Sequence, residues 1–188
     1  MIRQRVKQLS IIAFIAVIAS CKKDDDQPSI PQPIVNEPES ITSVELQFTS
    51  VDGISSFTAK WDDPDGLGGN EPLIDTIQLD SGVTYNVEVS FLDRSSGTSV
   101  DLTSEIEEEA AEHIICYALD VSTENTLEIA STDSDGNYRI GLKTQWQAKS
   151  LTSGELTLTL KHQPDGIKNG TCEPGETDVE VLFPLSIE

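Results

Sequence analysis

The segment that decides the fold class is Val179-Glu180-Val181-Leu182-Phe183-Pro184-Leu185-Ser186-Ile187. Large apolar side chains recur in it at every second position, at residues 179, 181, 183, 185 and 187. Successive side chains of an extended strand point to opposite faces, so this spacing gathers the apolar groups on one face. The segment therefore predicts a β-strand with one face buried in a core.

The same alternation recurs along the chain. It predicts strands at 44–48, 85–91, 140–146 and 156–160, and apolar runs predict further strands at 56–61, 74–79, 114–119 and 126–130. Turn-forming glycine, asparagine and aspartate residues separate these runs. A series of this kind predicts an all-β fold, an antiparallel immunoglobulin-like β-sandwich, with a barrel as the alternative. The pattern does not give the order of the strands.

Residues 104–113 break the alternation. They contain good helix formers and neither glycine nor proline. Ser104 is followed three residues later by Glu107, a spacing typical of a capping box at the start of a helix. We therefore expect one short helical insertion in the β-domain.

The first 20 residues have the layout of a secretory signal peptide. Arg3, Arg5 and Lys7 precede an apolar run from Leu9 to Ile18, which is shorter than the roughly 20 residues that span a bilayer. The run leads into Ile-Ala-Ser-Cys, which resembles the processing site of bacterial lipoproteins. That resemblance implies that Cys21 is lipidated and becomes the new N-terminus; an ordinary signal peptide is the alternative.

Residues 21–40 predict a tether between the lipid and the domain at 41–188. The stretch is acidic directly after Cys21 and then rich in proline, with too little apolar area to fold by itself. The acidic run resembles the export signal that sends Bacteroidota lipoproteins to the outer face of the outer membrane. It implies a surface-exposed protein, held to the membrane by its N-terminal lipid.

The net charge excludes some partners. The 188-residue chain carries 12 basic and 33 acidic residues, which gives a formal charge of −21. Removal of residues 1–20 takes away basic side chains and no acidic ones, so the remaining chain is more negative still. We therefore expect no nucleic acid as a partner, since nucleic-acid binding calls for a basic surface. An acidic surface is compatible with solubility alone, or with binding of cations or of a basic partner.

Histidines near acidic residues suggest one candidate metal site. Glu109 and His113 are spaced to share a helix face, and His162 is the only other histidine. If His162 packs against the helix end, two imidazoles and a carboxylate could bind a divalent transition-metal ion as cofactor. The alternative is that His113 caps the helix C-terminus and His162 is an ordinary loop residue.

A glycine-rich loop suggests a second candidate. Asp62, Asp63 and Asp65 precede several glycines and offer oxygen ligands to calcium, although their spacing is not that of an EF-hand. A plain polar turn is the alternative.

Cysteine usage fits an exported protein. With Cys21 lipidated, Cys116 and Cys172 remain, and they either form a disulfide or stay apart as a buried and a free thiol. The sequence contains no metalloprotease, hydrolase, phosphate-loop or dinucleotide motif, so we do not expect an enzyme and assign no catalytic residues.

Residues 41–188 contain several short motifs that occur together: Trp61-x-Asp63-x-Asp65-Gly66-x-Gly68-Gly69, Glu109-Ala110-x-Glu112-His113, Leu160-Lys161-His162-Gln163-Pro164, Gly175-Glu176-Thr177-Asp178 and Phe183-Pro184. This combination resembles a family of small, uncharacterised Bacteroidota lipoproteins. The family resemblance implies an accessory role beside an outer-membrane TonB-dependent receptor and supplies no catalytic residues. A structural or adhesive envelope module is the alternative function.

Overall fold

The structure, a computed structural model, describes residues 40–66 and 68–188. The described residues all belong to one compact unit. The predicted signal peptide, the lipidated Cys21 and nearly all of the tether lie outside the described residues, and those predictions stay open.

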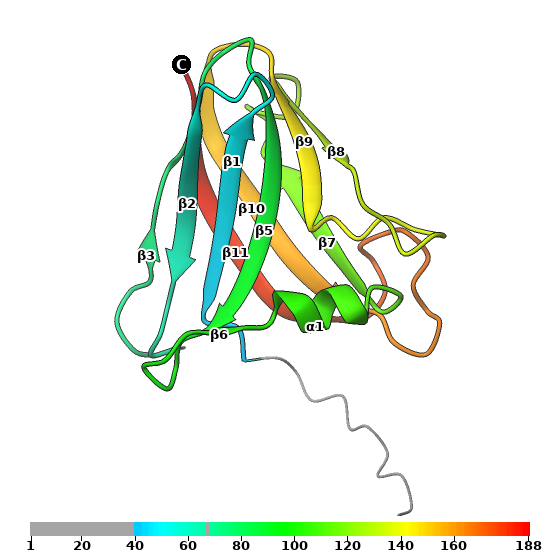
Figure 1. The fold of residues 1–188 in the computed structure, drawn as a ribbon. Helices are drawn as coiled ribbons and strands as arrows, with labels where there is room; N and C mark the ends of the chain where they lie inside the picture. Colours follow the sequence, from blue (N-terminus) through cyan, green and yellow to red (C-terminus); the bar gives the residue numbers. More distant parts are fainter. Residues whose placement is uncertain (1–39, 67) are drawn as a thin grey trace, which may run out of the picture. The chain divides into compact units, whose positions relative to one another are not determined.

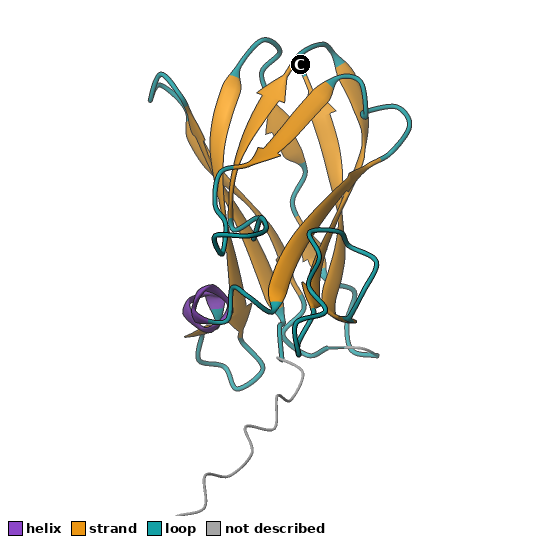
Figure 2. Ribbon diagram, turned by 90° about the vertical axis from the view of Figure 1, so that its right-hand side faces the viewer, coloured by secondary structure: helices purple, strands orange, loops and turns teal. Residues whose placement is uncertain are grey.

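Two β-sheets form the domain, and Figures 1 and 2 show them as two layers of strands. The larger sheet has the order β3-β2-β1-β5-β9-β8, with β6 paired to β5, and the smaller has the order β4-β11-β10-β7. The expected all-β sandwich with one short helix is confirmed. The strands of the larger sheet are β1 (Ser43–Ser50), β2 (Ser56–Asp62), β3 (Leu73–Ile74), β5 (Thr84–Asp93), β6 (Val100–Asp101), β8 (Leu127–Ser131) and β9 (Lys143–Ala148), and those of the smaller are β4 (Ile77–Leu79), β7 (His113–Leu119), β10 (Thr152–His162) and β11 (Glu176–Ile187).

The core lies between the sheets and follows the predicted alternation. The side chains that step by two along β1, β5, β10 and β11 are buried, whereas most of their neighbours are partly or fully exposed. Phe48 of β1 packs edge-to-face against Trp146 of β9, with ring centroids 5.2 Å apart. The Trp146 indole N–H donates to Thr144 Oγ1, so its polar atom is satisfied inside the core.

The predicted strand at 74–79 is wrong as a single element. Leu73–Ile74 pairs with β2 in the larger sheet, and Ile77–Leu79 pairs with β11 in the smaller one, in parallel. The chain changes sheets between them, after Asp75, whose backbone N–H and side-chain oxygen bond to Lys60 of β2. An alternation pattern cannot reveal such a crossing, because it does not contain the strand with which each half pairs.

The strand predicted at 140–146 begins later, at Lys143. Residues 140–142 instead bridge the two sheets: Ile115 of β7 donates to the Ile140 carbonyl, and Val89 of β5 donates to the Leu142 carbonyl. Gly141 between them has φ +96°, and a Cβ there would come within 2.9 Å of the Ile115 carbonyl oxygen. Only glycine fits this crossing without strain.

The helix is shorter than predicted. α1 spans Thr103–Glu108, its N-cap is Leu102, and no side chain caps it, so the predicted capping box at Ser104 is wrong. Thr103 Oγ1 accepts from the Phe91 N–H, which ties the start of the helix to the sheet.

The strand pairings define two ends of the sandwich. The end that carries α1, here the helix end, also carries the start of β1 and loops 63–72, 94–99, 132–142 and 163–175. The opposite end, here the far end, carries loops 51–55, 80–83, 120–126 and 149–151, together with Glu188 (Figure 1). Within the described part of the chain, no helix has the length and apolar character needed to cross a membrane.

Candidate functional site

The two histidines lie side by side at the helix end. His113 is the first residue of β7, and the antiparallel register places it directly opposite His162, the last residue of β10. The two imidazole rings stack with centroids 4.9 Å apart and planes 20° apart. The structure meets the condition that the metal-site hypothesis set, since the two histidines lie together, but the predicted helix face is wrong, because α1 ends before Glu109 and His113 lies in a strand.

Acidic groups surround this histidine pair. His113 Nδ1 lies 3.3 Å from the carbonyl oxygen of Glu109, the C-cap residue just after α1, and 4.0 Å from its carboxylate. His162 Nε2 lies 3.5 Å from Glu112 Oε2. His113 therefore contacts the last turn of the helix from the neighbouring strand.

Asp178 of β11 completes the cluster, and the sequence did not single it out as a ligand. Its Oδ2 lies 3.9 Å from His113 Nε2, its side chain is 4% exposed, and Oδ2 has no hydrogen-bond partner within the described residues. The alternation around Val179 predicts an outward-facing Asp178. A β-bulge changes this, because Leu160 pairs with Val179 whereas Lys161 pairs with Thr177, which leaves Asp178 as the extra residue.

Burial controls the charge of the cluster. Desolvation, followed by the nearby His162 ring, lowers the pKa of His113 to about 4. Desolvation also raises the pKa of Asp178, although His162 acts in the opposite direction. His113 is therefore neutral near pH 7, which is the form of imidazole that binds a metal.

The cluster is not a fully arranged metal site. No three or more His, Cys, Asp or Glu side chains among residues 40–66 and 68–188 already surround one point as metal ligands do. His113 Nε2 and Asp178 Oδ2 form the part of the cluster that faces inward, and the remaining candidate ligands, His162 and Glu112, lie around it.

A long loop, residues 163–175, begins directly after His162. The backbone N–H of Gln163 donates to the Glu112 carbonyl, and its buried side-chain amide donates to the Thr171 and Pro174 carbonyls. The structure joins Cys116 of β7 to Cys172 of this loop by a disulfide, one of the two states that the sequence left open. Loop 163–175 is thus fixed to the strand that carries His113.

In the predicted calcium loop, carboxylates form hydrogen bonds with other side chains and with the backbone. Asp62 Oδ1 accepts from Arg94 Nη1 at 2.9 Å, and Asp65 Oδ2 accepts from both nitrogens of Asn70. The bonds from Asn70 lower the pKa of Asp65. Asp63 is buried and its Oδ1 has no hydrogen-bond partner within the described residues. Two of the three carboxylates therefore already use an oxygen within the protein, and calcium binding there stays a prediction.

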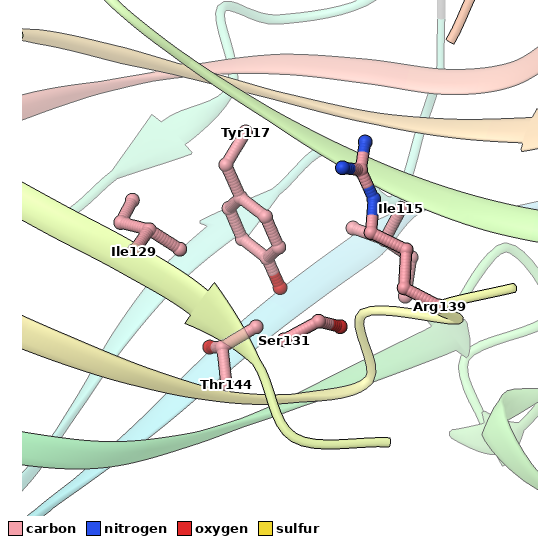
Figure 3. Close-up of a pocket in the computed structure, with 6 residues that line it drawn as sticks. All are labelled: Ile115, Tyr117, Ile129, Ser131, Arg139 and Thr144. Atoms are coloured by element: carbon pink, nitrogen blue, oxygen red, sulfur yellow. The ribbon is translucent and has the colours of Figure 1, made fainter. Parts of the chain in front are cut away.

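A small cavity lies where β7 faces β8 and β9, at the open side of the sandwich (Figure 3). Its volume is about 90 Å³, and the Tyr117 ring points across it. The Tyr117 hydroxyl donates to the Gly141 carbonyl, and burial raises the pKa of this hydroxyl strongly. The cavity is small for an organic ligand, and its main polar group is already bonded.

Comparisons with known proteins add little about function. No protein-family model and no curated protein matches the chain. The crystal structure of the S-layer protein SbsC domains 4 and 5 is similar over 76% of this chain and 75% of its own, with 13% identity and a TM-score of 0.28. A likeness this distant carries no argument about function, and the resemblance to Bacteroidota lipoproteins stays a prediction.

Proposed function

We propose that this chain is an envelope lipoprotein whose β-sandwich binds a divalent transition-metal ion at the helix end, through His113, Asp178 and His162. The lipid on Cys21 and the proline-rich tether would hold the domain at the outer membrane. The family resemblance makes a TonB-dependent receptor the partner to test. The role is binding, and no catalytic step is assigned.

The observation that carries the proposal is the facing pair His113 Nε2 and Asp178 Oδ2. The contact of Nδ1 with the Glu109 carbonyl favours a ring proton on Nδ1, so that Nε2, 3.9 Å from Asp178 Oδ2, is the nitrogen that would bind the ion. A backbone carbonyl that holds the outer nitrogen of a ligating histidine is a common second-shell arrangement. The 3.9 Å separation lets one ion contact both atoms at about 2.0–2.2 Å.

His162 and Glu112 supply the remaining ligands in this proposal. Both lie next to the facing pair, and the His162 side chain is 13% exposed, so it has more room to turn than His113. Rotation of this one ring brings a second imidazole toward the ion. A site with two imidazoles and carboxylates as ligands suits zinc, nickel or copper better than calcium or magnesium.

The experiment is a titration with cobalt and zinc of the chain from residue 22 onward, which contains the whole compact unit. Cobalt bound by nitrogen and oxygen ligands has a visible absorption spectrum, and zinc should displace it. Asp178→Asn keeps the side-chain shape and should weaken binding by tenfold or more. Glu180→Gln is the matched control, since Glu180 lies on the same strand with an exposed side chain.

Absence of saturable binding in the parent protein, or equal affinity in the parent and Asp178→Asn, would refute the metal site. Labelling of cells with a radioactive fatty acid tests the anchor separately. The parent should carry the label and Cys21→Ser should not.

The far end favours one alternative, a structural or adhesive module. Four large aliphatic side chains are exposed there on three different loops, opposite the end at which the chain enters β1: Val51, Ile54, Val121 and Leu151. Self-association or adhesion that disappears in an Ile54→Ser/Val121→Ser double variant, without any metal dependence, would support this function instead.

A further inference from the structure

A second cavity lies at the helix end, apart from the histidine cluster. It has a volume of about 480 Å³ and lies between the loop that follows β2 and the loop that follows β5. We refer to it as the loop cavity. The residues that matter below are Asp63, Pro64, Asp65, Glu71, Leu73 and Arg94.

The positive charge at its edge is already neutralised. Arg94 Nη1 donates to Asp62 at 2.9 Å, and Nη2 donates to Glu45 at 2.6 Å. Lys60 also pairs with Glu45, at 2.9 Å. These four side chains balance one another in charge, so Arg94 offers no net positive charge to the cavity.

The other acidic side chains that line the cavity are not neutralised by a basic side chain. Asp63, Asp65 and Glu71 take part in no salt bridge within the described residues. Asp65 accepts hydrogen bonds from the backbone and side-chain nitrogens of Asn70, which are neutral groups. The cavity is therefore negative on balance, with three carboxylates on one wall.

Asp63 gives the strongest indication of a ligand. The residue is 8% exposed, it lines the cavity, and its Oδ1 is buried without a hydrogen-bond partner in the described part of the chain. A carboxylate removed from water is destabilised unless a donor or a cation compensates it. A positively charged group in the cavity would provide that compensation.

The size and lining of the cavity indicate what carries the charge. A volume of about 480 Å³ is in the range of small-molecule pockets and far exceeds the space of one ion. Pro64 and Leu73 provide apolar surface, and Leu73 is 74% exposed. We propose that the loop cavity binds an organic cation, a primary ammonium group on a hydrocarbon stem, with the ammonium at Asp63 and the stem against Leu73.

Two probes carry this chemistry from different sources. 1,5-Diaminopentane represents a free amine, and Nα-acetyl-lysine amide represents a lysine side chain of a protein. Titration of the chain from residue 22 onward, followed by NMR shifts of the loop cavity, should give saturable binding of at least one. Binding of only the lysine probe would assign a protein partner, and binding of only the diamine a free amine. 1-Pentanol, which lacks the charge, should not bind.

Two variants test the assigned contacts. Asp63→Asn should weaken the binding of the responding probe by about tenfold or more, because it removes the carboxylate charge that attracts the ammonium group. Leu73→Ala should weaken it less, and should leave methylammonium binding unchanged. Glu88→Gln, on an exposed position of β5, is the charge-matched control and should bind as the parent does.

The proposal fails if neither probe saturates at about 10 mM, if 1-pentanol binds equally well, or if Asp63→Asn binds as tightly as the parent. Calcium alone that shifts the same resonances and displaces the probes at lower concentration would also overturn it, in favour of a metal ion. His113, His162 and Asp178 do not line this cavity, so failure here leaves the proposed metal site untouched.

Discussion

Lys168 and Asp135 form a buried ion pair between two loops of the helix end. The distance from Lys168 Nζ to Asp135 Oδ2 is 2.8 Å, and both side chains are almost fully buried. Lys168 Nζ also donates to the Ala110 carbonyl just beyond α1, at 2.7 Å. One ammonium group thus joins loop 163–175, loop 132–142 and the end of the helix.

Removal of the lysine charge should destabilise the domain strongly. In Lys168→Met the Asp135 carboxylate stays buried without its counter-ion, which typically costs about 3–5 kcal/mol of unfolding free energy. Lys143→Met is the matched control, since Lys143 forms an exposed pair with Glu107 and its loss should cost at most about 1 kcal/mol. Urea denaturation of both variants measures the difference. Equal losses would contradict the burial of the Lys168 pair.

Acid should remove the contribution of Asp135. Desolvation alone would raise its pKa, but the hydrogen bonds from Lys168 and from the Tyr138 and Asn137 N–H groups outweigh it and lower the pKa to about 2. A carboxyl with a lowered pKa stabilises the fold above its unfolded value of 3.8, and that stability is lost as the pH falls toward 2. The difference in unfolding free energy between the parent and Asp135→Asn should therefore be constant above about pH 5 and shrink below pH 4. A pH-independent difference would show that the pair does not titrate this way.

The disulfide should stabilise loop 163–175, which follows His162. Cys116 and Cys172 are 56 residues apart in sequence, and closing a loop of that length restricts the unfolded chain by roughly 4 kcal/mol in the chain-entropy model. The Cys116→Ser/Cys172→Ser double variant should lose stability of that order. Loop 163–175 should also exchange its amide hydrogens faster, whereas loop 51–55 at the far end should not change. Intact mass with and without reductant checks that the bond is present.

The register of β11 predicts that substitutions at two adjacent residues have very different effects on stability. Phe183 is fully buried between the sheets, and Phe183→Ala should cost about 3–5 kcal/mol of unfolding free energy. Leu182 is 45% exposed on the outer face, and Leu182→Ala should cost less than about 1 kcal/mol. A larger loss at Leu182 would mean that the strand is shifted by one residue.

The sequence predicted the parts of the fold that depend on period-two burial, such as Val44 to Phe48 in β1 and Val179 to Ile187 in β11. The predictions were wrong where the chain departs from regular strand pairing. The crossing at Asp75, the bridge at Gly141 and the bulge at Asp178 depend on contacts with residues far away in sequence, which local alternation does not contain.

The candidate site, like the fold, could be predicted only in part. The sequence left the approach of His113 to His162 open, as a condition of the metal-site hypothesis, and the structure brings the two together through a strand register instead of a helix face. Asp178 was missed because only the bulge turns it toward His113. Asp63 was named for calcium, but its buried and unpartnered oxygen could not be inferred, since it depends on how two separate loops pack.

The position of β1 also determines how the domain would bear a mechanical load. The chain enters β1 at the helix end, and β1 lies between β2 and β5 with ladder pairing on both sides. Tension that enters at Ser40 and is resisted by a grip on the far-end loops would act along the strand axis. The hydrogen bonds from β1 to β2 and from β1 to β5 would then be loaded in shear, all at the same time. They would not break one after another. The domain would therefore resist a force applied between these two ends through several strand pairings at once.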